Sequence, residues 1–211
     1  MRVTSLRRSV WMLATAALLF AGALQAAPTA GREYSKLANP QTPETQGKTE
    51  VIEFFSWGCP HCYHFHPLLD QWAAKLPKNV KLVRIPVSMG HAQWGQLVRA
   101  YYTLEATGDL ARLDGALFDA IHKQGQQLYN EDSLARWAVS QGIDEAKFRQ
   151  TFNSFNVSTR ASHAERLSRD YQVQGIPQLV VAGKYVVLGN DFNQMLANAT
   201  QVIELAAQEG K

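Results

Sequence analysis

The chain has 211 residues, of which 46% are hydrophobic and 18% are charged, a balance typical of one globular domain with a sizeable core. The formal net charge of +3 comes from the first 26 residues, which hold Arg2, Arg7 and Arg8 and no acid. Removing these three from the 21 basic side chains leaves 18 against 18 acidic ones. A neutral chain gives no electrostatic case for nucleic acid or an anionic membrane as a partner.

The N-terminus has the pattern of a secretory signal peptide. Arg7 and Arg8 precede an almost wholly apolar run at 10–24, and Leu24-Gln25-Ala26 ends in a small residue. We therefore predict a signal peptide over residues 1–26, removed after Ala26. The alternative is a retained membrane anchor, but the run is short for a span of about 20 residues.

The next elements form a strand–helix–strand unit. Residues 27–48 are rich in proline, glycine and polar side chains and predict a loosely ordered lead-in. Residues 51–55 form an apolar run with one acid, typical of a strand buried on both faces. A helix is predicted from Pro60 to before Pro77, because proline suits the first turn and stops a helix. Residues 80–87 predict the next strand.

A helical stretch separates this unit from a second strand region. Between 90 and 174 the apolar residues recur at helical spacing only. Strands are then predicted at 178–182 and 185–188 around a Gly-Lys turn, followed by a helix with Asp191 and Gln194 as a capping pair. The sequence thus predicts an α/β domain, in parts 49–89 and 175–211, split by an all-helical insertion at 90–174.

The only two cysteines, Cys59 and Cys62, lie three apart at the predicted strand-to-helix junction. Export would place them where disulfides persist. A bridge between them would close almost no loop and so stabilise the fold little, which favours a chemical role. Disulfide exchange needs a thiolate, and Cys59 precedes a helix whose free N–H groups favour negative charge. Pro60 starts that helix, and His61 in its first turn can donate a hydrogen bond or partial positive charge to the sulfur. Cys62 lies about one turn on, within bridging reach.

The cysteine motif has three other interpretations, each less favoured than redox chemistry. An inert structural bridge is disfavoured by the short loop. A metal site with His61, His64 and His66 is disfavoured because a structural zinc site needs a closed set of four ligands and the chain has no second cysteine pair. Coincidence is disfavoured by the strand–motif–helix context. A stabilised Cys59 thiolate stabilises the reduced enzyme, which makes its disulfide an oxidant.

The run VIEFFSWGCPHCY at 51–63 resembles the DsbA family of periplasmic oxidases, and Gly175-Ile176-Pro177 resembles the family's second landmark. The likeness covers about residues 48–205 and implies a thioredoxin fold with an inserted all-helical domain. It also implies that Pro177 has a cis peptide bond and faces the cysteines, leaving the Ile176 backbone free to pair with an extended client peptide. From the residues alone, a trans, purely structural Pro177 is an equal alternative.

Glu53 is an acid inside an apolar strand, so we expect it to be buried with a raised pKa. The family places a buried acid here, under the second cysteine, where it can take or relay a proton. The alternative is a strand-end acid that reaches solvent. The family pairs this acid with lysine, and Arg84 stands at that position here. Arginine does not readily lose its proton, so Arg84 is expected to hold Glu53 ionised or to be exposed.

The resemblance implies a periplasmic thiol:disulfide oxidoreductase that donates the Cys59–Cys62 disulfide to reduced, unfolded exported proteins. It implies reoxidation by a DsbB-like membrane protein, and the chain has no cofactor motif of its own. We expect a monomer. The alternatives are a thiol reductase or isomerase and a thiol-based metal carrier. An isomerase is disfavoured because no dimerisation module precedes the redox region.

Overall fold

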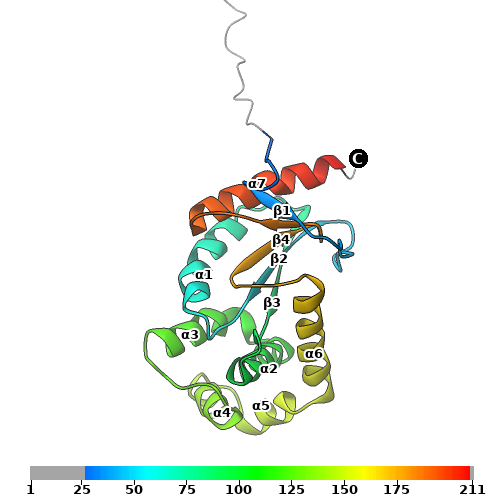
Figure 1. Cartoon of the computed structure of the whole chain (residues 1–211). Helices are drawn as coiled ribbons and strands as arrows, with labels where there is room; N and C mark the ends of the chain where they lie inside the picture. Colours follow the sequence, from blue (N-terminus) through cyan, green and yellow to red (C-terminus); the bar gives the residue numbers. More distant parts are fainter. Residues whose placement is uncertain (1–26, 210–211) are drawn as a thin grey trace, which may run out of the picture.

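The structure is a computed structural model that describes residues 27–209; the expected signal peptide at 1–26 lies outside the described residues. A five-stranded sheet forms the centre (Figure 1). Its strands run in the spatial order β1-β5-β4-β2-β3. Their bounds are β1 Tyr34–Lys36, β2 Thr49–Phe55, β3 Val80–Pro86, β4 Gln178–Val181 and β5 Tyr185–Val187.

The central strand β2 has parallel and antiparallel neighbours. It pairs in parallel with β3 and antiparallel with β4, while β4–β5 and β5–β1 are antiparallel. The β2–β3 register places Glu53 opposite Arg84. Strand residues alternate between the two faces of a sheet, so Val51 and Glu53 share one face and Ile52 and Phe54 the other. The register therefore sets the acid beside its basic neighbour.

The described residues also form seven helices. Their bounds are α1 Pro60–Ala73, α2 Ala92–Thr107, α3 Leu110–His122, α4 Glu131–Ser140, α5 Glu145–Phe152, α6 Phe155–Asp170 and α7 Phe192–Glu209. Helices α1 and α7 contribute Phe65, Leu69 and Val202 to a core that includes Val51. The other core joins Ile52 and Phe54 to the apolar faces of the inserted helices. The sheet thus separates two cores.

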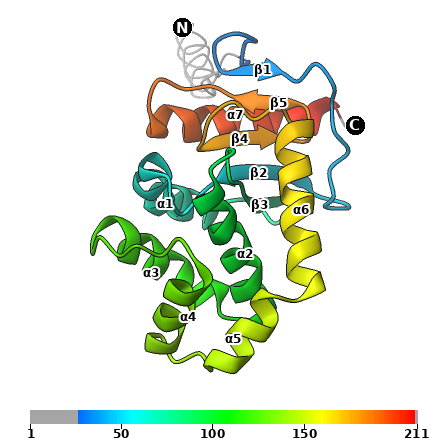
Figure 2. The same ribbon diagram turned by 60° about the horizontal axis from the view of Figure 1, so that its bottom comes forward.

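Helices α2 to α6 lie between β3 and β4 in sequence and form the lower part of the molecule in Figures 1 and 2. The predicted all-helical stretch is confirmed, because residues 90–174 contain these five helices and no strand. Helix α6 passes back along the sheet toward β4 (Figure 2). The insertion therefore leaves the sheet at the edge strand β3 and returns the chain to it at β4, on the other side of β2.

The lead-in at 27–48 is more ordered than its composition indicates, because its residues Tyr34–Lys36 form β1. This strand pairs with β5 at the sheet edge. Three residues are too few to display the alternation that identifies a strand, and the pairing partner lies far along the sequence. The other predicted strands, the helix after Cys59 and the helix after Asp191 occur close to their expected bounds.

The cap predicted for α7 also forms, since the Gln194 backbone N–H donates to Asp191 Oδ1 at 2.8 Å. Across residues 27–209, no helix combines the length and the apolar character that crossing a bilayer requires.

Candidate active site

Cys59 and Cys62 lie where β2 passes into α1. The Cys59 backbone N–H donates to the Ser56 carbonyl oxygen at 3.1 Å, which closes a turn after the strand. Cys59 is the N-cap of α1, with an extended backbone (φ −88°, ψ 118°), and Pro60 follows in the first turn. Proline is tolerated there because its missing N–H would have no partner inside the helix. The local sequence thus places the Cys59 sulfur at the helix start.

The surroundings of Cys59 favour its thiolate. Its Sγ accepts a hydrogen bond from the Cys62 backbone N–H at 3.3 Å. A hydrogen bond from the Cys62 thiol, helped by the backbone N–H groups of Cys62 and His61 and the nearby His61 ring, lowers the pKa of Cys59 to about 6. Burial opposes this shift. Donors at a helix N-terminus stabilise an anion in this way.

Cys62 is tuned in the opposite direction. Its side chain is fully buried, whereas Cys59 keeps 4% of its surface exposed. Burial, together with the adjacent Cys59 sulfur, raises the pKa of Cys62 above the ordinary thiol range. Two neighbouring thiols with opposite shifts give the pair one anionic sulfur, which keeps a slight exposure, and one protonated sulfur, which is fully buried. The two thiols are free in this structure, and the Cys62 thiol donates a hydrogen bond to the Cys59 sulfur.

Pro177 faces the motif from the other side. The Ile176–Pro177 peptide bond is cis, as the resemblance implies. The Ile176 carbonyl oxygen lies 3.7 Å from Cys59 Sγ, although the two residues are separated by the whole insertion. Gln178, which follows Pro177 and begins β4, pairs with Phe54 of β2. The polar backbone of Ile176 therefore lies next to the reactive sulfur.

Glu53 and Arg84 form a buried ion pair. The Glu53 side chain has no exposed surface, and Arg84 Nε donates to its Oε2 at 2.5 Å. Burial raises the pKa of Glu53, and the Arg84 charge opposes that rise. Arg84 also pairs with Asp114 and lies 4.0 Å from the centre of the Phe55 ring. The expectation that Glu53 is buried is confirmed, and the alternative of an exposed Arg84 is wrong, because its side chain is only 12% exposed.

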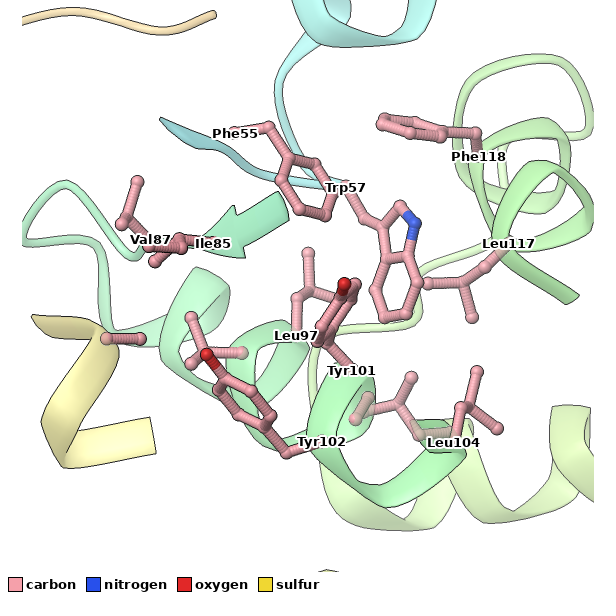
Figure 3. Packing of buried hydrophobic residues seen from close by; sticks show 14 of the residues in the cluster. Phe55, Trp57, Ile85, Val87, Leu97, Tyr101, Tyr102, Leu104, Leu117 and Phe118 are labelled. Atoms are coloured by element: carbon pink, nitrogen blue, oxygen red, sulfur yellow. The ribbon is translucent and has the colours of Figure 1, made fainter. Parts of the chain in front are cut away.

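Three residues of α3 belong to this site and were not predicted from the sequence. Asp114 binds Trp57 and Arg84, Asp119 binds Tyr63, and His122 binds the Trp57 carbonyl. Figure 3 shows Trp57 beside Tyr101 and the α3 side chains of Leu117 and Phe118. Asp114 and Trp57 are 57 positions apart, and no local pattern connects them. Only the docking of the insertion brings them together.

The histidines of the proposed metal alternative do not converge with the cysteines. His61 and His64 are exposed on the first turns of α1, whereas His66 is largely covered. Among residues 27–209, no three His, Cys, Asp or Glu side chains are placed to hold a metal ion.

The lowered pKa of Cys59 predicts a pH-dependent stability of the reduced protein. A thiol with a folded pKa of about 6 and an unfolded value of about 8.5 stabilises the reduced fold fully above pH 8.5. This contribution declines as the pH falls and is lost below about 6. We expect denaturant unfolding of the reduced protein to show this change, with thiolate absorbance titrating near pH 6. The oxidised protein, which has no such thiol, should show neither; a midpoint near 8.5 would contradict the geometry.

Comparison with known proteins agrees with this site. The family model of the DSBA-like thioredoxin domain matches residues 50–201. The chain is 40% identical over 174 residues to the thiol:disulfide interchange protein DsbA of Pseudomonas aeruginosa, which covers 82% of each chain. It is 37% identical over 200 residues to that of Bordetella pertussis, which covers 91% of this chain and 94% of the relative.

Solved structures give the same result. The crystal structure of Pseudomonas aeruginosa DsbA matches with a TM-score of 0.81 at 36% identity, covering 87% of this chain and 96% of that one. The oxidoreductase DsbA from Xylella fastidiosa matches with a TM-score of 0.81 at 31% identity, covering 86% and 99%. The expected thioredoxin fold with a helical insertion is thereby confirmed. The chain belongs to the DSBA-like thioredoxin family of thiol:disulfide oxidoreductases.

Proposed function

We propose that this protein works as an oxidase, donating the Cys59–Cys62 disulfide to reduced, unfolded exported proteins in the periplasm. The observation that carries the proposal is the lowered pKa of Cys59 beside a buried Cys62. A disulfide whose reduced form contains a stabilised thiolate is readily reduced, because the product is favoured. The lowered pKa of Cys59 therefore favours transfer of the disulfide to a client over reduction of a client disulfide.

The reaction is two successive thiol–disulfide exchanges. A client thiolate attacks Cys59 Sγ of the oxidised enzyme, forming a mixed disulfide and releasing Cys62, which takes up a proton. The second client thiolate attacks the client sulfur of that mixed disulfide and releases Cys59 as a thiolate. The client dithiol loses two electrons and two protons, and the enzyme disulfide gains the two electrons. Cys59 is a good leaving group because its pKa is low.

Client binding is proposed at the Ile176–Pro177 turn. The Ile176 carbonyl lies beside Cys59 Sγ, and an extended peptide pairing with this backbone would carry its cysteine to the sulfur. Pro60 and His61 are exposed at the same end of α1. These positions support roles for Ile176 and Pro177 in binding, and for His61 in supporting the Cys59 thiolate.

We further propose that Glu53 exchanges the proton of Cys62 and that Arg84 holds the charge of Glu53. The support is their buried contact on the α1 face of β2 and the electrostatic influence of Glu53 on Cys62. Each cycle leaves the enzyme reduced, so an external oxidant must restore the bridge. Membership in the family supports a DsbB-like membrane protein in that role, with the enzyme acting as a monomer and without a cofactor.

Equilibration with glutathione tests the proposed direction. We expect the purified oxidised protein to oxidise a reduced peptide dithiol stoichiometrically. We also expect it to become reduced in glutathione buffers in which thioredoxin-like reductases stay oxidised. The equilibrium is measured by alkylating free thiols after acid quenching. An equilibrium constant near that of a thioredoxin, whose potential is about −270 mV, would assign a reductase instead.

A further inference from the structure

Helix α3 of the insertion holds Trp57 at two separate atoms. The Trp57 indole N–H donates to Asp114 Oδ1 at 2.7 Å. The Trp57 carbonyl oxygen lies 2.7 Å from His122 Nε2, and a carbonyl only accepts, so Nε2 carries the proton and donates. Trp57 is 1% exposed. Its side chain and its backbone are therefore fixed by the same helix, two residues before Cys59.

The same helix holds the residue that follows Cys62. The Tyr63 hydroxyl donates to Asp119 Oδ1 at 3.0 Å. The Tyr63 ring stacks on the His122 ring, with centroids 5.0 Å apart and planes at 21°. His122 thus contacts both flanks of the motif, the Trp57 carbonyl on one side and the Tyr63 ring on the other. Helix α3 therefore contacts the chain on both sides of residues 58–62, at Trp57 and at Tyr63.

Residues 58–62 contain the backbone N–H groups that stabilise the Cys59 thiolate. Cys59 Sγ accepts from the Cys62 backbone N–H at 3.3 Å, a normal distance for a hydrogen bond to the large sulfur atom. A small change in the direction of the Trp57–Gly58 peptide or of the first turn of α1 would weaken that bond, because hydrogen bonds lose strength steeply with misalignment. Fixing both flanks preserves the alignment.

We propose that Asp114, Asp119 and His122 are positioning residues with which α3 clamps the redox motif and sets the oxidising strength of its disulfide. The inference rests on the proposed oxidase function and assigns a chemical purpose to the contact between the insertion and the motif. The three residues make their hydrogen bonds to Trp57 and Tyr63 rather than to the cysteine sulfurs, and they act through those two residues. Partly buried hydrogen bonds and aromatic contacts of this kind hold side chains in one arrangement.

His122→Phe is the sharpest test, because phenylalanine keeps a ring to stack on Tyr63 and removes the donor to Trp57. We expect the variant to raise the pKa of Cys59 by up to about one unit and to make the disulfide about threefold to tenfold less oxidising against glutathione. His122→Gln, whose amide N–H can reach the same carbonyl, should recover most of the loss. Tyr63→Phe removes only the bond to Asp119 and should give a smaller change in the same direction.

Leu113→Ala is the matched control, because Leu113 is a buried residue of α3 that makes no contact with Trp57 or Tyr63 through a hydrogen bond. It should lower stability while leaving the Cys59 titration and the glutathione equilibrium unchanged. If His122→Phe behaves like Leu113→Ala, losing stability with no change in either readout, α3 has only a structural role and the proposal is overturned. The oxidase function is tested separately, because its failure would appear in the equilibrium constant that the unchanged protein reaches with glutathione.

Discussion

Replacing Cys59 by serine is expected to reduce client oxidation to the uncatalysed rate. A serine oxygen forms no disulfide, so neither the resting bridge nor the mixed disulfide with the client can exist. Cys62 does not substitute for it, because its sulfur is fully buried and its pKa is raised. The measurement is the rate at which a reduced peptide dithiol loses its free thiols with catalytic enzyme and excess oxidant.

The companion variant, Cys62→Ser, is expected to accumulate mixed disulfides. It keeps the reactive Cys59 thiolate and lacks the Cys62 sulfur that would otherwise attack Cys59, displace the client from the adduct and restore the internal bridge. Non-reducing gels and mass spectrometry of the adducts provide the readout, and the double variant without either cysteine is the control that should trap nothing. Full turnover by Cys62→Ser would show that the second sulfur has no resolving role.

Arg84→Met should be the most destabilising single change outside the core. Methionine fills much of the space of the arginine stem but leaves Glu53, which has no exposed surface, without its positive partner. Breaking a buried ion pair by removing one partner costs about 3–5 kcal/mol. Urea unfolding of the oxidised protein measures the loss without interference from the thiols.

The loss should depend on pH with a defined sign. The Arg84 charge opposes the rise that burial causes in the pKa of Glu53, so removing it raises that pKa further. An acid with a higher pKa in the folded protein than in the unfolded one destabilises the fold as the pH rises above the unfolded value of about 4.3. The variant should therefore be closest to the unchanged protein at low pH and fall behind it toward neutrality.

Adding Glu53→Gln to Arg84→Met provides the control, because glutamine has no charge to leave unpaired. This double variant should recover much of the stability and lose the pH dependence. An Arg84→Met protein with unchanged stability at neutral pH would mean that the buried pair contributes nothing to the fold.

The parts of the site that depend on neighbouring residues could be predicted from the sequence. The spacing of Cys59 and Cys62 is one helical turn, and Pro60 marks where that turn begins. Local periodicity is enough for these features, because each lies within one predicted element or at its end. The family resemblance alone suggested that Arg84 stands near Glu53, and the parallel register of β2 and β3 places the two residues opposite each other.

The rest depends on contacts between distant segments. Asp114 and His122 occupy a helix whose pattern indicates only that one face is buried, and nothing in that pattern identifies Trp57 as the contact. Strand β1 is three residues long, so its assignment depends on β5 rather than on its own sequence. For Arg84, the sequence left two positions open, and the contacts of its side chain with Glu53 and with Asp114 of α3 decide between them.

The insertion separates the two halves of the site by a long stretch of chain, since Cys59 Sγ and the Ile176 carbonyl come from residues 117 positions apart. Contacts of such separation form late in folding. Because the N-terminal part of the polypeptide emerges first, both cysteines are exposed long before the Ile176–Pro177 turn is available. A half-emerged molecule therefore has thiols but no place to seat a substrate, and it is itself a reduced, unfolded chain of the kind that finished molecules oxidise.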